Sequence, residues 1–85
     1  MATAKYFERE LNLRLEEADS RGIPHLDISS GAFHRDMGGY PGPNHRMPVV
    51  CGVLYKAMRG SDRILHQPPS GFGASVRIRY FLPRR

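Results

Sequence analysis

The last third of the sequence contains the pattern that most limits the fold. Apolar side chains alternate with other residues over positions 75–82, at Val76, Ile78, Tyr80 and Leu82. This two-residue period is typical of a strand with one buried face. A second strand-like run, residues 63–67, precedes it, and the turn-forming segment Pro68 to Gly73 lies between the two. The sequence therefore predicts a C-terminal β-hairpin over residues 63–82.

The segment before this hairpin, residues 47–59, has the period of a helix. Its apolar side chains recur three and four residues apart, at Val50, Val53, Leu54, Ala57 and Met58, with Cys51 beside them. Pro48 suits the first turn, because the N–H that proline lacks has no partner there. Gly52 costs about 1 kcal/mol in mid-helix relative to alanine. It permits close approach either to another helix or to a sugar-phosphate backbone, of which helix packing is the commoner reason.

Residues 3–21 form a second expected helix, which is amphipathic. Its apolar stripe repeats at spacings of three and four, at Ala4, Phe7, Leu11, Leu15 and Ala18. Thr3 can cap the start of this helix, and Gly22 can end it in a left-handed conformation. Tyr6 and Leu13 lie off the stripe. They are either ordinary exposed residues, which is the commoner case, or a small contact between two copies.

A short strand and a further short helix follow. Residues 25–28 alternate, as in a lone edge strand. Ser29 and Ser30 then offer an N-cap for a helix over residues 30–37. Three of its residues are expected to face inward: Ala32, Phe33 and Met37. The next segment, residues 40–44, contains two prolines and a glycine and is expected to be a turn.

Taken in order, the expected elements are a helix, a short strand, two helices, a strand, a wing and a strand, over residues 1–85 as one domain. This order resembles the winged helix-turn-helix superfamily. The connection before the third helix is longer than the three or four residues of the simplest helix-turn-helix. The resemblance implies a small α+β fold with three helices and a C-terminal β-hairpin wing. The expected core is Phe7, Leu11, Leu15, Phe33, Val50, Leu54, Met58, Ile64, Val76, Ile78 and Tyr80.

The positive charge is concentrated outside the first helix. The formal net charge is +5, and the isoelectric point is about 10. Residues 22–85 hold nine of the 13 Lys and Arg but only three of the eight Asp and Glu. This asymmetry indicates either a polyanion partner or a basic surface that is merely solvated. A chain of 85 residues also excludes a cofactor fold combined with a substrate domain.

The resemblance implies a nucleic-acid interface on the third helix, over residues 47–59. The start of such a helix meets base edges in the major groove. The residues at those positions are Asn44, His45, Arg46, Val49 and, one turn further on, Gly52 and Lys56. Arginine can read guanine and asparagine can read adenine, each through two hydrogen bonds. Alternatively, Asn44 caps the helix, and His45 and Arg46 are only solvated.

The wing would contribute a second part of the interface. Arg77 and Arg79 lie on one face of the last strand, about 7 Å apart, which suits phosphate contacts or entry into the minor groove. Small residues at the tip would let the backbone approach a phosphate: Ser70, Gly71 and Gly73. Phe72 could wedge, stack or tuck back on the hairpin. Further arginines add to the same field: Arg63, Arg84 and Arg85.

The sequence contains no convincing set of catalytic or metal-binding residues. The four histidines and the one cysteine show no zinc-binding spacing. Residues 34–36 and 44–46 contain residue types used in phosphodiester hydrolysis. Such chemistry needs clustered carboxylates, however, and Asp27, Asp36 and Asp62 are far apart in sequence. We therefore expect no enzyme activity, no metal and no cofactor.

The expected function is non-catalytic binding of double-stranded DNA, in a regulatory or defence role. The alternative is a winged-helix module, or a small inhibitor, that binds a protein partner. A homodimer through the first helix is a further expectation, based on Tyr6 and Leu13. The single cysteine excludes an internal disulfide, and the sequence shows no apolar leader and no membrane-length run. These features predict a cytoplasmic protein without membrane contact.

Overall fold

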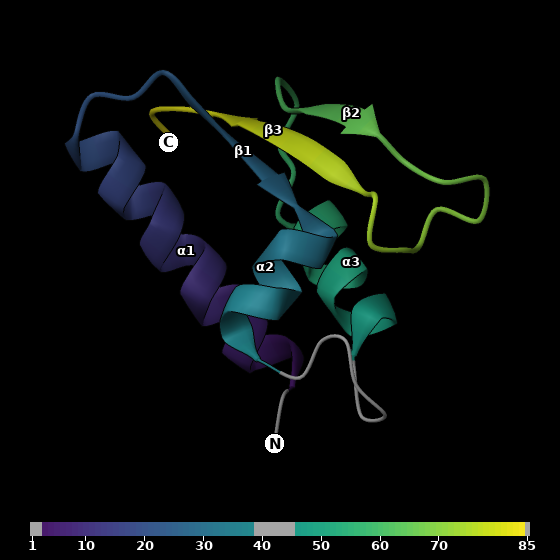
Figure 1. Cartoon of the computed structure of the whole chain (residues 1–85). Helices are drawn as coiled ribbons and strands as arrows, with labels where there is room; N and C mark the ends of the chain where they lie inside the picture. The colour runs from purple at the N-terminus through teal and green to yellow at the C-terminus, as the bar shows by residue number, and fades with distance from the viewer. Residues whose placement is uncertain (1–2, 39–45, 85) are drawn as a thin grey trace.

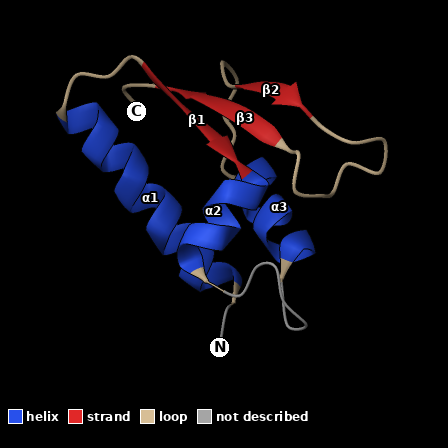
Figure 2. Ribbon diagram, in the orientation of Figure 1, coloured by secondary structure: helices blue, strands red, loops and turns tan. Residues whose placement is uncertain are grey.

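Three helices pack on one side of a three-stranded antiparallel sheet in the part of the chain that the structure describes (Figure 1, Figure 2). This computed structural model describes residues 3–38 and 46–84. The helices are α1 (Ala4–Ser20), α2 (Ser30–Met37) and α3 (Met47–Lys56). The strands are β1 (His25–Ser29), β2 (Arg63–His66) and β3 (Arg77–Phe81), in the order β1-β3-β2. The expected small α+β class with three helices is confirmed.

The helix starts agree with the capping residues of the sequence. The Thr3 hydroxyl accepts the backbone N–H of Tyr6 at 3.4 Å, and the Ser29 hydroxyl accepts that of Ala32 at 3.3 Å. Each bond satisfies one of the N–H groups that a helix start leaves without a partner. After α1, Gly22 adopts the predicted left-handed conformation, with φ of 74°. Pro48 lies in the first turn of α3, as predicted.

Helix α3 ends at Lys56, earlier than the predicted residue 59. The N–H of Arg59 donates to the carboxylate of Asp62 at 2.9 Å. The guanidinium of Arg84 donates to the carbonyl of Ala57. Two side chains from later in the sequence thus satisfy backbone groups that a further helical turn would have used.

The C-terminal strands pair with each other, but they are shorter than predicted and the loop between them is longer. Residues 67–76 connect β2 to β3, in place of the tighter predicted tip. An irregularity between Ile64 and His66 shifts the register of β2. The carbonyl of Val76 accepts the N–H of Ser30 at 2.8 Å. This bond continues the β1–β3 register by one residue and holds the chain before β3 to the start of α2.

The core lies between the helices and the inner face of the sheet. Its apolar residues are Phe7, Leu11, Leu15, Ile28, Phe33, Met47, Val50, Cys51, Val53, Leu54, Val76, Ile78 and Tyr80. Inward predictions fail at Ile64 and Ala32 and are met only in part at Met37, Ala57 and Met58. Ile64 is 43% exposed, because β2 is an edge strand on which every residue is exposed. Met58 is only partly buried, and Ala32 is exposed, since α2 turns Phe33 and His34 inward instead.

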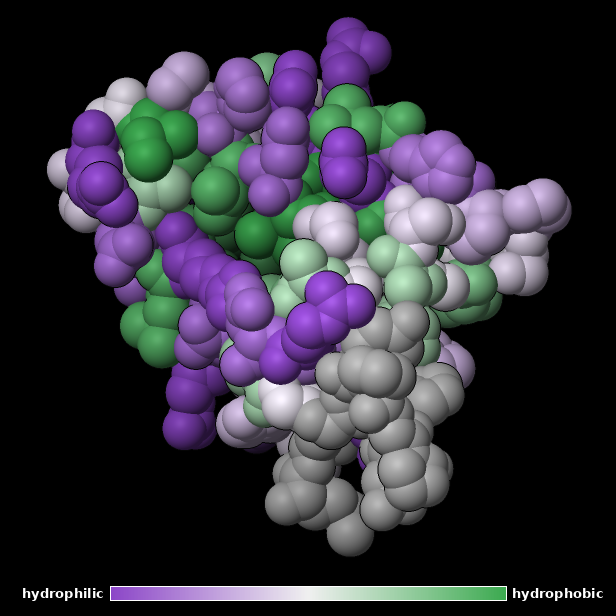
Figure 3. Space-filling view, in the orientation of Figure 1, coloured by the Kyte–Doolittle hydropathy of each residue, from purple (hydrophilic) through white to green (hydrophobic). Residues whose placement is uncertain are grey.

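The outer face of the sheet carries a different set of side chains from the core face. Figure 3 shows hydrophilic side chains over the strands at the top of the view, with hydrophobic ones between them. Strand β3 pairs with both neighbours, so that Ile28 and Ile78 face each other on the buried side while Asp27 and Arg79 face each other on the outer side. The alternation predicted for residues 75–82 is therefore confirmed within β3.

Candidate nucleic-acid interface

Helix α3 presents an exposed face with a bare stretch of backbone in the middle. Gly52 and Lys56, four residues apart, are exposed on this face, and Arg46 stands at the N-cap. Val49 lies at the edge of this face, half-buried and packed against the core. A Cβ atom added to Gly52 would meet nothing within 4 Å. Packing against another helix within residues 3–38 and 46–84 therefore does not explain this glycine. From Arg46 to Lys56 the exposed face extends about 15 Å.

The start of α3 is fixed to α2 by a buried histidine that sequence reasoning did not select. The backbone N–H of Arg46 donates to Nε2 of His34 at 2.8 Å. His34 is 1% exposed and packs edge-on against Phe7, with ring centroids 5.3 Å apart. The bond satisfies an N–H at the helix start and holds the Arg46 backbone in place. A histidine six residues before the turn-rich segment, residues 40–44, was the one available signal.

Two of the predicted interface residues, Asn44 and His45, lie outside the described residues. The N-cap of α3 is Arg46, and its side chain makes no capping hydrogen bond. The guanidinium of Arg46 and the ammonium of Lys56 are both exposed, and neither is in an ion pair within residues 3–38 and 46–84. Of the residues predicted for this helix, the structure thus places Arg46 and Lys56 at the start and toward the end of the exposed face, whereas Val49 is half-buried and packs against the core.

The tip loop, residues 67–73, is fastened to α3 instead of projecting freely. The hydroxyl of Tyr55 donates to the carbonyl of Gly71 at 2.5 Å. The rings of Tyr55 and Phe72 meet edge-on, with centroids 6.1 Å apart. Phe72 remains 51% exposed and contacts Tyr55 on α3; of the three alternatives for this ring, wedging or stacking on a ligand remain predictions. The tip loop and α3 therefore form one continuous surface.

The end of the tip loop is held from two sides. The hydroxyl of Ser30 donates to the carbonyl of Gly73 at 2.5 Å, and the thiol of Cys51 donates to the same oxygen at 3.4 Å. Cys51 is 0% exposed, so its thiol is buried. The hydroxyl of Ser70 makes a local turn instead, donating to the carbonyl of Phe72 at 2.9 Å. Ser70 itself is exposed at the tip.

Arg77 and Arg79 lie on the outer face of the sheet, and only one of them is in an ion pair. Arg79 donates two hydrogen bonds to the carboxylate of Asp27, at 2.9 and 3.1 Å. The hydrogen bond from Arg79 is the main reason that the pKa of Asp27 lies below its usual value. Arg77 is exposed, opposite Ser29 and His66, with no ion pair among the described residues. Arg77 is thus the freer of the two cations.

The carboxylates outside α1 do not gather. Each forms a salt bridge with a different arginine: Asp27 with Arg79, Asp36 with Arg14, and Asp62 with Arg84. Within residues 3–38 and 46–84, no group of three or more His, Cys, Asp or Glu side chains is placed to hold a metal ion. The three carboxylates weighed for phosphodiester hydrolysis are therefore not brought together, although His34 does contact the backbone of Arg46.

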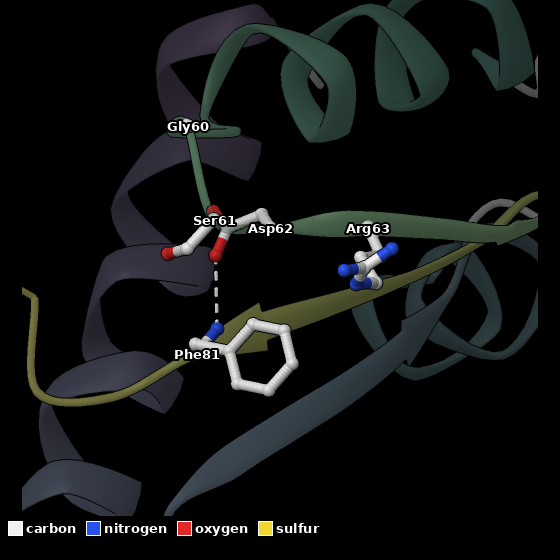
Figure 4. A pocket seen from close by; sticks show the side chains of 5 residues that line it. All are labelled: Gly60, Ser61, Asp62, Arg63 and Phe81. Atoms are coloured by element: carbon white, nitrogen blue, oxygen red, sulfur yellow. Dashed lines mark hydrogen bonds between the residues drawn. The ribbon is translucent and has the colours of Figure 1, made fainter.

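An open hollow of about 410 Å³ lies beside the start of β2 and the end of β3 (Figure 4). It is lined by Gly60, Ser61, Asp62, Arg63 and Phe81. The Asp62 carboxylate is committed to the backbone N–H of Phe81 at 2.9 Å, drawn as a dashed line, and to Arg84 at 2.8 Å. The groups left free toward the opening are the ring of Phe81, the guanidinium of Arg63 and the hydroxyl of Ser61.

Comparisons with protein-family models, with curated proteins and with solved structures found no match to this chain. Among the described helices, none combines the length with the apolar character that crossing a membrane requires.

Proposed function

We propose that this protein is a winged helix-turn-helix protein that binds double-stranded DNA without catalysis. The observation that carries the proposal is the exposed face of α3, with cations at Arg46 and Lys56 and no side chain at Gly52 between them. The order α1-β1-α2-α3-β2-β3 supports it, because this is the order expected of that superfamily. In the proposal, α3 is the recognition helix.

The dimensions of α3 suit a major groove. The groove of B-DNA is about 12 Å wide and admits one helix. Arg46 at the start of α3 would reach a base edge or a phosphate, and the start of a helix also favours an anion. Gly52 would let the helix backbone come close to the sugar-phosphate chain. Lys56, one helical turn further along, would neutralise a second phosphate.

The tip loop would act as the wing. The bonds from Tyr55 keep it beside α3, so that both could meet one duplex. Ser70 at the tip and Arg77 at the base of β3 would contact the backbone or the adjacent minor groove. Arg79 would contribute less, because its guanidinium already binds Asp27.

The test is fluorescence anisotropy of the purified chain with random duplex DNA across a salt series. We expect binding at about 50 mM salt that weakens steeply as salt rises. Arg46→Gln with Lys56→Gln should reduce the log–log salt slope by about two, since each phosphate contact contributes about 0.9. The matched control is Lys5→Gln with Arg21→Gln, which removes two exposed charges from α1 and its C-cap.

Two results would contradict the proposal. One is the absence of duplex binding at about 50 mM salt, where even non-specific phosphate contacts are detectable. The other is an equal loss of affinity in the α3 pair and in the α1 control pair. That result would show that net charge alone, and not the face of α3, determines binding.

Self-association through α1 is the second candidate, and one observation favours it. Tyr6 and Leu13 are 46% and 53% exposed, and both line an open groove of about 350 Å³ with Met37. Exposed apolar side chains around a groove are typical of contacts between proteins. A dimer through this groove would present two α3 faces to DNA. A different protein could also occupy the groove, as in the interaction-module alternative.

A further inference from the structure

The outer sheet face, the side of the sheet that faces away from the helices, carries rows of cross-strand neighbours. Asp27, Arg79 and Arg63 form one row across β1, β3 and β2. Side chains directly opposite in antiparallel strands project on the same side, so Arg79 lies between Asp27 on one side and Arg63 on the other. The next row contains Arg77 with His66. Three arginines thus share this face with a single carboxylate.

The carboxylate compensates only one of these arginines. Asp27 binds Arg79 through both oxygens. Arg63 lies opposite Arg79 without an ion pair among the described residues, and like charges in that position repel each other. Arg77 is also exposed. This strip of the outer sheet face, formed by Asp27, Arg63, Arg77 and Arg79, therefore has an excess of positive charge, which a bound anion would neutralise.

An aromatic surface and the hollow adjoin this strip. Phe81 faces outward beside His25, with ring centroids 6.0 Å apart. Phe81 also lines the hollow of about 410 Å³ together with Arg63 and Ser61 (Figure 4). A volume of this size is in the range of small-ligand pockets. A flat ring and a cation at one opening would suit a base and the phosphate attached to it.

We propose that the outer sheet face binds single-stranded nucleic acid, with one base against Phe81 in the hollow and the sugar-phosphate chain along Arg63 and Arg77. Aromatic rings that stack on bases, beside cations that follow the backbone, are the means by which proteins hold single strands. The strip is a sheet surface, with no helix that could enter a major groove, which favours a single strand over a duplex. This proposal does not depend on duplex binding by α3.

The test is anisotropy with a fluorescent oligothymidylate of about 15 nucleotides, within the range of site sizes for such proteins. Phe81→Leu and, separately, Arg63→Gln should each weaken its binding by at least about fivefold, the lower bound for loss of one stacked base. Arg63→Lys retains the charge and should restore most of the affinity. Duplex affinity should change less than twofold in all three variants. The pair Arg46→Gln and Lys56→Gln should leave the single-strand affinity intact.

Circular dichroism first establishes that each variant is folded, and Arg63→Gln, at an exposed position, keeps the test valid if Phe81→Leu does not fold. No binding of the parental chain to the oligothymidylate at about 50 mM salt would overturn the proposal, whatever the duplex result. Unchanged single-strand affinity in Arg63→Gln would overturn it as well. If Arg63→Gln and the Arg46→Gln, Lys56→Gln pair weaken single-strand binding equally, net charge alone determines that binding, and the proposal is overturned.

Discussion

Removing the carboxylate of Asp62 should destabilise this domain more than any exposed ion-pair substitution. The side chain of Asp62 is 1% exposed and that of Arg84 is 13% exposed. The carboxylate accepts from the N–H groups of Phe81 and Arg59, each at 2.9 Å, and from Arg84 at 2.8 Å. It therefore joins the end of α3, the end of β3 and the C-terminal segment.

The magnitude follows from what Asp62→Ala would leave behind. Removing one partner of a buried ion pair costs about 3–5 kcal/mol. Two backbone N–H groups also lose their acceptor, and part of that cost, about 1–3 kcal/mol each, overlaps with the first. We therefore expect a loss of about 4 kcal/mol from a total free energy of unfolding of about 5–15 kcal/mol. For a domain of this size, the melting temperature should fall by roughly 15–30 °C.

The same group gives a prediction for acid stability. Burial raises the pKa of Asp62, but hydrogen bonds from Phe81, Arg84 and Arg59 outweigh it and hold the pKa below the usual 3.8. A carboxyl group whose pKa is lowered by folding stabilises the protein above its unfolded pKa. That stabilisation is lost as the pH falls below 3.8 through the folded pKa. The stability gap between the parent and Asp62→Asn should therefore narrow toward about pH 2.

The assay is thermal and urea denaturation followed by circular dichroism, with Asp27→Ala as the matched control. The Asp27→Ala substitution also breaks an ion pair with two hydrogen bonds, the one to Arg79, but both side chains of that pair are 35% exposed. Exposed pairs contribute about 0–1 kcal/mol, so the control should melt within a few degrees of the parent. If Asp62→Ala melts as close to the parent as Asp27→Ala does, the structural role assigned to the buried carboxylate is wrong.

Two further predictions concern the glycines and the surface of α1. Gly31→Ala should destabilise the protein by about 1–3 kcal/mol, because the new Cβ would lie 2.9 Å from the carbonyl oxygen of Ala74. Gly52→Ala should instead stabilise the protein by up to about 1 kcal/mol. If thermal denaturation shows that both substitutions raise, or both lower, the melting temperature, the prediction is contradicted. If the parent protein is a dimer through α1, Leu13→Glu should be a monomer in sedimentation equilibrium. A parent protein that is already monomeric, or a Leu13→Glu variant that stays dimeric, would exclude α1 as the dimer contact.

Local patterns in the sequence were enough to predict most elements of the fold. The stripe from Phe7 to Leu15, the caps at Thr3 and Ser29, and the alternation through Ile78 each depend on neighbouring residues, which the sequence displays directly. The end of α3 was missed because Asp62 and Arg84 capture its last backbone groups. Bonds between side chains and distant backbone are set by the folded chain and have no local signal.

The sequence was enough to predict which residues give the candidate interface its positive charge, but not which of them form ion pairs. Arg77 and Arg79 look equivalent in sequence, yet only Arg79 binds Asp27, which is 52 residues away along the chain. The contact of Tyr55 with the tip loop likewise joins segments that no local pattern connects. Periodicity indicates which face of a strand a residue occupies, but it does not indicate which residue of opposite charge lies beside it on the neighbouring strand.

The pairing of charges bears on whether the basic surface of this protein is specialised or only solvated. The acids outside α1 neutralise arginines at structural positions, and they do so on separate elements. On α1, Lys5 and Arg9 are exposed without an ion pair among the described residues. Outside α1, such cations include Arg46 and Lys56 on α3 and Arg63 and Arg77 on the sheet. A surface that serves only solubility has both signs interspersed. Because the two sets lie on different elements with no shared partner, substitutions in one set should add to those in the other. Strong coupling between them would mean that one ligand spans both, and the two proposed faces would then be a single site.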